Sequence, residues 1–366
     1  MNIPMVDLVN QYHRIKKEID RAIKDVLESG RFIMGPMVTA FEEEMANYCG
    51  VKYGIACASG TDALMMALMA SGVSSGDEVI TTPFTFVATA EVIALLGAKP
   101  VYVDIEPDTY LIDPDKIEKA VTSKTKAIIP VHLYGQSADM DKINTIAKKH
   151  KLVVIEDACQ AVGATYKGEK VCSLGDIGCL SFFPSKNLGT FGDGGMVLTS
   201  NEALAEKLRM IRNHGSEKRY HHTILGLNSR LDALQAAILM VKLRYLDEWN
   251  EARKDRAALY SELLKDTDVV TPVIKDTNEH VFHQYSIRVK NRNGLQKYLE
   301  QSGIATAIHY PVPLHLQPAF QKLRQKEEHL PIAEKTAEEI ISLPMYPELK
   351  EEAIEFIAGK IIEFTE

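Results

Sequence analysis

The stretch LVVIEDACQ (Leu152–Gln160) decides the fold, because it is an apolar run that ends in carboxylates and a turn. Uninterrupted apolar runs of this length are typical of strands buried on both faces of a parallel sheet, whereas half-exposed strands alternate. Three more segments have the same character: VITTPF (79–84), PVYVDI (100–105) and AIIPVHL (127–133). Segments with helical periodicity separate them, so this part of the chain predicts an α/β fold with a parallel sheet.

The later part of the chain has a different pattern. Ser229–Leu264 contains neither Gly nor Pro and predicts one long amphipathic helix. After it come VFHQYSIRV (281–289) as a strand, GLQKYLEQSG (294–303) as a helix and the Pro-rich HYPVPLHLQPAF (309–320) as a loop. We therefore predict a large domain, residues 1–250, and a smaller C-terminal α+β domain, residues 251–366, with the boundary inside the long helix.

Composition excludes several classes of protein. The chain of 366 residues carries 42 Lys plus Arg against 50 Asp plus Glu, a net charge of -8, which argues against broad nucleic-acid binding. No stretch approaches the roughly 18 apolar residues that a membrane span needs, and the N-terminus lacks an export signal. The five cysteines form no CxxC pair, and His221 and His222 have no companion at ligand spacing. We expect a cytoplasmic protein with free thiols and no metal.

The strongest chemical signal is SFFPSKNLGTFGDGGM (181–196), where Lys186 follows a strand-like SFF and precedes a glycine-dense turn. Most lysines are solvated, so an exposed loop lysine is the simpler interpretation. A confined lysine amine has a lowered pKa and attacks aldehydes, and glycines let a planar group approach the backbone. The residues alone leave both interpretations open.

Asp157 is predicted at the carboxyl end of a buried strand, where open α/β sheets bind ligands. It either caps a following helix or holds a pyridine nitrogen protonated, as in sites for pyridoxal phosphate (PLP). Gln160, three residues on, is placed to bond a neighbouring ring substituent. Phe86 is either a core residue or an aromatic ring that stacks on a cofactor.

The turn CASGTDAL (57–64) runs into a predicted helix. Ser59 or Thr61 is a suitable N-cap, and the same free backbone amides, with the helix dipole, form an anion site. The alternative phosphate loops fail: GATYKGEK has Glu169 where a P-loop requires Lys, and GTFGDGG does not match GxGxxG. ATP and nicotinamide cofactors are therefore disfavoured.

Taken in order, these segments resemble the DegT and StrS group of PLP-dependent sugar aminotransferases. The resemblance extends over nearly the whole chain, through VDLVNQY (6–12), YGQSADMD (134–141), RNHGSEKRYHHTILGLNSRLDALQAAIL (212–239) and SLPMYPEL (342–349). It implies the type I PLP-dependent transferase fold, with a mostly parallel seven-stranded sheet in the large domain and a smaller α+β domain. It also implies a homodimer with shared active sites.

The resemblance assigns roles to individual residues. Lys186 would form the Schiff base with PLP and move protons between the substrate and the cofactor, and Asp157 would pair with the pyridine nitrogen. The other cofactor contacts that it implies are Gly60, Thr61 and Ser181 at the phosphate, Gln160 near the ring hydroxyl, Phe86 on the ring face and Asn228 reaching the phosphate from the other subunit. Related sugar dehydratases have histidine in place of Lys186.

The implied reaction moves an amino group from L-glutamate to a keto sugar nucleotide by a ping-pong mechanism. The nearest branch acts on UDP-2-acetamido-2-deoxy-3-oxo-glucuronate, with Arg230, His309 and Tyr310 as hypothesised readers of the sugar carboxylate. Arg230 is equally suited to a structural ion pair with Asp232 or across the dimer. Tyr346 stands where histidine is common in relatives. The alternatives are a dTDP-3-keto-6-deoxyhexose 3-aminotransferase, a 4-keto sugar nucleotide aminotransferase and a non-catalytic regulatory protein on the same scaffold.

Overall fold

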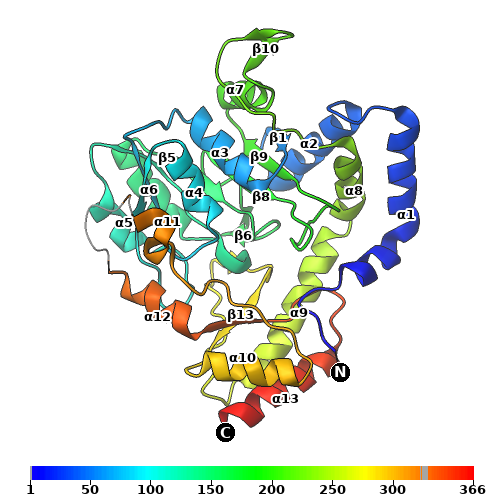
Figure 1. Cartoon of the computed structure of the whole chain (residues 1–366), viewed down its shortest axis with the longest axis vertical. Helices are drawn as coiled ribbons and strands as arrows, with labels where there is room; N and C mark the ends of the chain where they lie inside the picture. Colours follow the sequence, from blue (N-terminus) through cyan, green and yellow to red (C-terminus); the bar gives the residue numbers. More distant parts are fainter. Residues whose placement is uncertain (1, 322, 324–328) are drawn as a thin grey trace.

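The computed structural model describes residues 2–321, 323 and 329–366 and contains a seven-stranded sheet in the order β1-β9-β8-β5-β4-β2-β3 (Figure 1). Its strands are β1 (Tyr53–Cys57), β2 (Glu78–Thr81), β3 (Lys99–Tyr102), β4 (Thr125–Ile128), β5 (Val153–Asp157), β8 (Ile177–Ser181) and β9 (Gly195–Thr199). β9 runs antiparallel to β1 and β8, and the other pairings in this sheet are parallel. The predicted α/β fold with a mostly parallel sheet is confirmed.

Helices cover both faces of this sheet, which explains the uninterrupted apolar strands. In β5, Ile155 packs in a cluster with α3 (Gly60–Ala70), whereas the adjacent Val154 packs with α5 and α6 on the opposite face. Successive strand residues point to opposite faces, so a strand covered on both sides is apolar at every position. The helices of this part are α1 (Leu8–Ser29), α2 (Pro36–Cys49), α4 (Ala88–Leu95), α5 (Pro114–Ala120), α6 (Met140–His150), α7 (Glu202–Arg212) and α8 (Ala233–Leu243).

A second hydrophobic core lies below the sheet in Figure 1. It includes the antiparallel pair β13 (Tyr285–Arg288) and β14 (Ile340–Leu343) and the helices α9 (Leu246–Leu264), α10 (Arg292–Gln301) and α13 (Glu351–Thr365). Ile3, near the N-terminus, packs into the same core. The smaller α+β unit is therefore present, and residue 250 stays our proposed boundary for the two domains.

The remaining elements are short. They are β6 (Thr165–Tyr166), β7 (Glu169–Lys170), β10 (Ser216–Lys218), β11 (His221–His222), β12 (Asn278–Glu279), α11 (Pro318–Gln321), α12 (Pro331–Glu339) and the 3-10 turns Leu133–Gly135 and Leu314–Leu316. The predicted loop 309–320 thus contains one 3-10 turn and the start of α11. Of the strand predicted over 281–289, only β13 (Tyr285–Arg288) forms. Within the described residues, no helix is long and apolar enough to cross a membrane.

The single helix predicted over Ser229–Leu264 is wrong. The chain forms α8 and α9 with a break at Arg244 and Tyr245, and α8 begins only at Ala233. Glu18 of α1 accepts hydrogen bonds from both Arg244 and the Tyr245 hydroxyl, and the Tyr245 ring stacks on Trp249 at 5.7 Å between centroids. The hydrogen bonds to Glu18 of the distant α1 and the local stacking of Tyr245 on Trp249 stabilise a break that neither glycine nor proline marks in the sequence.

Gly195 at the start of β9 lets this strand pass the turn that begins α3. A Cβ at Gly195 would lie 2.2 Å from the Ser59 carbonyl oxygen and 2.8 Å from the Gly60 amide nitrogen. Gly60 is equally constrained, because its Cβ would lie 2.6 Å from Ser181 Cβ in β8. The two glycines therefore allow the start of α3 to sit directly on the ends of β8 and β9.

We predict that Gly195→Ala lowers the free energy of unfolding by roughly 1–3 kcal/mol, because backbone atoms must move to admit the methyl group. The matched control is Gly359→Ala in α13, where a Cβ meets nothing within 4 Å. That change should stabilise the protein by about 0.5–1 kcal/mol through helix propensity. Urea unfolding of both variants measures the difference, and equal midpoints for Gly195→Ala and the wild type would contradict the argument.

Candidate active site

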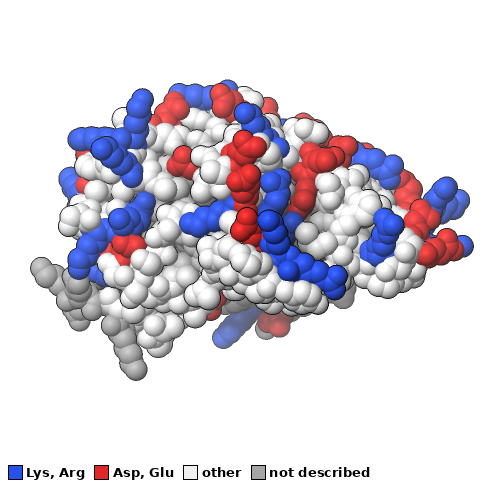
Figure 2. Space-filling model, turned by 90° about the horizontal axis from the view of Figure 1, so that it is seen from above, with Lys and Arg blue, Asp and Glu red and all other residues white. Residues whose placement is uncertain are grey.

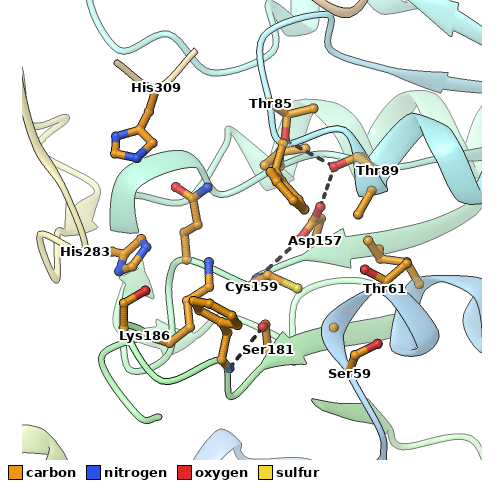
Figure 3. Close-up of a pocket in the computed structure, with 18 of the residues that line it drawn as sticks. Ser59, Thr61, Thr85, Thr89, Asp157, Cys159, Ser181, Lys186, His283 and His309 are labelled. Carbon is orange, nitrogen blue, oxygen red and sulfur yellow. Dashed lines mark hydrogen bonds between the residues drawn. The ribbon is translucent and has the colours of Figure 1, made fainter. Parts of the chain in front are cut away.

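A cavity of about 460 Å³ opens where the carboxyl ends of β2, β5 and β8 meet the start of α3. This volume falls in the range of small-molecule sites, and the position is the one at which open α/β sheets bind ligands. Segments from the second core close one side of the cavity, because His283 and His309 line it as well (Figure 3). The cavity is therefore built from parts of the chain that are far apart in sequence.

All but two of the predicted site residues line this cavity. They are Gly60, Thr61, Phe86, Asp157, Gln160, Ser181, Lys186, His309 and Tyr310. Asn228 is exposed, and Arg230 donates to the Asn213 side-chain oxygen at 3.1 Å, so neither reaches the cavity of its own chain. No ion pair joins Arg230 to Asp232 within the described part of the chain.

The start of α3 combines the two roles left open for it. The Ser59 hydroxyl accepts a hydrogen bond from the Asp62 amide at 3.1 Å and so caps the helix. The amides of Gly60 and Thr61 have no hydrogen-bond partner among the described residues, and both residues line the cavity. Free amides at the positive end of a helix dipole bind phosphate. The cap and the anion site are thus compatible.

Asp157 is held by two donors. The Thr89 hydroxyl donates to Oδ2 at 2.7 Å, and the Cys159 amide donates to Oδ1 at 3.2 Å (Figure 3). Thr85 lies 3.1 Å from the Thr89 hydroxyl and extends this network. Turns follow Asp157 where a helix was one expectation, so the capping interpretation is wrong. The carboxylate instead faces the cavity from a fixed position, with 5% of its surface exposed.

Lys186 is not a solvated loop lysine. Its side chain is partly buried on the cavity wall and has no hydrogen-bond partner within the described residues. Burial lowers the pKa of its amine, and the nearby Cys159 and Asp157 oppose that shift. A tight turn positions it, in which the Lys186 amide donates to the Phe183 carbonyl at 2.8 Å. A lysine with a lowered pKa and no partner is suited to nucleophilic chemistry.

Gln160 and Tyr310 form one wall of the cavity. The Gln160 carboxamide accepts from the Tyr134 amide at 2.8 Å and donates to the Tyr310 hydroxyl at 3.0 Å, so its orientation is determined. The Tyr310 ring packs near Phe84 and Phe86, and burial raises the pKa of its hydroxyl. Phe86 keeps 54% of its surface exposed, which leaves its ring available to a ligand in the cavity.

Sequence analysis missed Thr85, Thr89 and His283 as cavity residues. Thr89 is the second residue of α4 and Thr85 lies in the bend before it, so no helical spacing relates the two hydroxyls, and it is their contact with each other and with Asp157 that brings them together. His283 falls in a segment interpreted only as a strand, and no local pattern indicates its contact with the cavity. Its position depends on how the second core packs against the sheet.

His309 generates a pH prediction. Burial, and secondarily Lys186, lowers the pKa of this histidine from 6.5 to about 4. The unfolded chain therefore binds a proton near pH 6.5 that the folded protein binds only near pH 4, and stability falls as the pH falls between these values. The free energy of unfolding of the wild type therefore changes with pH in this range. We expect His309→Gln to reduce that pH dependence by up to about 1.4 kcal/mol per pH unit.

Urea unfolding of both proteins between pH 6 and pH 5 measures this slope. At pH 8 His309 is neutral in the folded and unfolded states, so the difference between the two proteins there reports only lost contacts. One such contact joins His309 Nδ1 and the Ser342 hydroxyl at 2.8 Å. Parallel pH profiles for the variant and the wild type would show that His309 does not titrate in this way.

Comparison with known proteins agrees with this geometry. The model of the DegT/DnrJ/EryC1/StrS aminotransferase family matches residues 13–362. The chain is 56% identical over its whole length to a protein of Geobacillus stearothermophilus named pleiotropic regulatory protein, covering 99% of it. It is 51% identical to the UDP-2-acetamido-2-deoxy-3-oxo-D-glucuronate aminotransferase of Pseudomonas aeruginosa, over 98% of this chain and 99% of that protein. Other relatives are named transaminases of dTDP-linked amino sugars.

Solved structures show the same fold. DesV of S. venezuelae, crystallised with a ketimine intermediate, superposes with a TM-score of 0.97 at 41% identity, covering 100% of this chain and 99% of that one. Other solved relatives hold PLP or its pyridoxamine form. From the family match over most of its length and these close relatives, the chain belongs to the DegT/DnrJ/EryC1/StrS family of PLP-dependent aminotransferases.

Proposed function

We propose that this protein transfers an amino group from L-glutamate to the keto group of a 3-keto nucleotide sugar, with UDP-2-acetamido-2-deoxy-3-oxo-glucuronate as the first candidate. The observation that supports this most is the unpartnered amine of Lys186 in the same cavity as Asp157 and the start of α3. These three features suit the aldehyde, the ring nitrogen and the phosphate of PLP, respectively.

The residues present fit the cofactor. Gly60 lies against Ser181 so closely that a Cβ would clash at 2.6 Å, which leaves a compact cradle for a phosphate group beside free amides. Asp157, held by Thr89, is placed to pair with the ring nitrogen, and Phe86 offers an aromatic face. Bound PLP supplies an electron-poor ring that stabilises negative charge at the substrate carbon.

The chain's own groups then have separate tasks. Lys186 holds and moves the proton at the carbon that gains or loses the amine, because burial lowers the pKa of its amine and so favours the neutral form that can accept a proton. Asp157 would hold a positive charge on the ring nitrogen of bound PLP. The rings of Phe86 and Tyr310 on the cavity wall restrict the entry of water. One cavity that serves donor and acceptor in turn requires ping-pong kinetics.

The choice of sugar depends on Arg230, His309 and Tyr310. His309 and Tyr310 line the cavity, and Arg230 does not. We propose that Arg230 and Asn228 act in the cavity of a second subunit. The segment that carries them extends from the strand pair β10 and β11, which projects from the body of the molecule in Figure 1. On this projection Tyr220 is 82% exposed and Leu225 is 90% exposed, as a contact with another protein chain would favour.

The surface at this end does not favour nucleic acid. Figure 2 looks down on it and shows Lys and Arg mixed with Asp and Glu, without a broad basic area on that face. The five cysteines Cys49, Cys57, Cys159, Cys172 and Cys179 are all free thiols. We therefore propose a homodimer that works in the cytoplasm on small anionic substrates.

A single-turnover absorbance assay tests the function. The protein is converted to the pyridoxamine form with glutamate, the donor is removed, and keto sugar nucleotides are added one at a time. We expect the absorbance of the PLP form to return with the UDP-linked 3-keto uronate and not with dTDP-linked 3-keto-6-deoxy sugars.

Arg230→Gln should raise the KM for the uronate by about 10- to 100-fold, because the sugar carboxylate loses a bidentate partner.

Each other outcome changes the conclusion in a defined way. Return of the absorbance only with a dTDP sugar would remove the carboxylate assignment of Arg230, His309 and Tyr310, and return only with 4-keto sugars would change the keto position. Wild-type protein that binds PLP but transfers no amine from glutamate would favour the regulatory function named for the relative from G. stearothermophilus. Lys186→Ala serves as the inactive control.

Mixing two inactive variants tests the shared site. Lys186→Ala and Asn228→Ala protein, refolded or exchanged together, should recover up to about a quarter of wild-type activity, because half of the dimers are mixed and each has one intact site. Each variant alone should be inactive at the PLP concentration used: Lys186→Ala lacks the reactive amine, and Asn228→Ala binds PLP too weakly. No recovery in mixtures whose subunit exchange is demonstrated by mass would contradict a site shared between subunits.

A further inference from the structure

His283 and Lys186 line the same cavity, and each has a hydrogen-bonding group without a partner in the described part of the chain: an acceptor on His283 and donors on Lys186. His283 precedes β13, and its Nδ1 lies 3.2 Å from the side-chain oxygen of Asn187. Asn187 is the residue after Lys186, so one turn carries both the lysine and the partner of the histidine. The two side chains that line the cavity are thus connected through Asn187.

The orientation of Asn187 determines which nitrogen of His283 carries the hydrogen. The Asn187 side-chain nitrogen donates to Asn250 Oδ1 at 2.8 Å and to the Val281 carbonyl at 2.9 Å. Asn250 in turn donates to the Val162 carbonyl at 3.1 Å, so its oxygen has to face Asn187. The Asn187 oxygen therefore faces His283, and Nδ1 of the histidine must be the donor.

Nε2 of His283 consequently has a free lone pair. No hydrogen bond to Nε2 is formed by the described residues, and the ring lines the cavity. The charged and titratable groups around the ring are Lys186, Arg253 and His309. Burial, with these groups, holds the pKa of His283 well below its usual value. The ring thus presents a neutral acceptor to the cavity at physiological pH.

Lys186 has hydrogen-bond donors without acceptors, whereas His283 has an acceptor without a donor. Its amine carries up to three N–H donors, and none has a partner among the described residues. Figure 3 shows Lys186 with His283 on one side and Asp157 on the other. Asp157 is already bound by Thr89 and Cys159 and is reserved for the ring nitrogen in the proposed function. Nε2 of His283 is an acceptor without a partner in the described part of the chain, and it lines the same cavity as the amine.

We propose that His283 is a positioning residue for Lys186: when pyridoxamine phosphate occupies the cavity, the free amine of Lys186 turns toward Nε2 and donates a hydrogen bond to it. Asn187 holds the histidine in the tautomer that makes this possible. The inference rests on the proposed role of Lys186. A neutral acceptor stabilises the protonated amine more than the neutral amine, so His283 retains a proton on Lys186 between the two halves of the reaction.

Two substitutions separate the two nitrogens of the ring. His283→Asn keeps a donor at the place of Nδ1 and removes the acceptor in the cavity. His283→Gln keeps an amide oxygen near the place of Nε2. Proteins loaded with pyridoxamine phosphate are labelled with acetic anhydride over a range of pH, and the acetylation of Lys186 is measured by peptide mass spectrometry. The rate reports the neutral fraction of the amine.

We expect His283→Asn to lower the apparent pKa of Lys186 by about one unit, which raises labelling about tenfold at a fixed pH below that pKa. His283→Gln should stay within about threefold of the wild type. Lys242, a buried lysine that donates to the Gly189 carbonyl outside the cavity lining, is the internal reference and should be unchanged in both variants.

Equal labelling of Lys186 in wild type and His283→Asn would overturn the inference, as would equal increases in both variants, which would indicate a general loosening of the site. Borohydride reduction of wild-type protein loaded with PLP distinguishes this failure from failure of the proposed function. A stable adduct on the peptide with Lys186 shows that the lysine binds the cofactor, whatever His283 does. Its absence would remove the proposed role of Lys186 itself and this inference with it.

Discussion

The pairing of β5 between β4 and β8 is the constraint on which the site depends. Because these strands are parallel, their carboxyl ends reach the same edge of the sheet, and Asp157 and Ser181 are delivered there from separate parts of the chain. Both faces of β5 are covered by helices, so a shift of one residue in its register would place buried apolar side chains on the wrong face. The position of Asp157 at the sheet edge is therefore determined by the packing of apolar side chains on both faces of β5.

Close backbone approach at this edge is the second requirement. Gly60 and Gly195 let the start of α3 rest on β8 and β9 without side chains between them. This contact directs the free amides of α3 into the cavity beside Ser181. The anion site is thus a consequence of how tightly the helix packs on the sheet, and hydrogen bonding alone would not position it.

The polar network behind the cavity controls its chemistry. Thr89 and the Cys159 amide hold Asp157, while Gln160 joins Tyr134 to Tyr310 and Asn187 joins Asn250 to His283. These bonds satisfy Asp157, Gln160 and Asn187, whereas the amine of Lys186 is a donor without a partner in the described part of the chain. Burial then lowers the pKa of that amine. The reactivity proposed for Lys186 follows from what surrounds it.

The sequence by itself determined the α/β class, the buried strands and most of the cavity residues, because these are local properties: apolar runs, helix starts and strand ends. It placed Asp157 at a strand end and Lys186 in a glycine-rich turn but left their chemistry open, and it did not indicate Thr89 and His283, whose contacts join segments 68 or more residues apart, as Thr89 and Asp157 do. It missed the break between α8 and α9, which depends on Glu18 from α1. Only the tertiary structure decided these features, since long-range contacts leave no periodic trace in the chain that forms them.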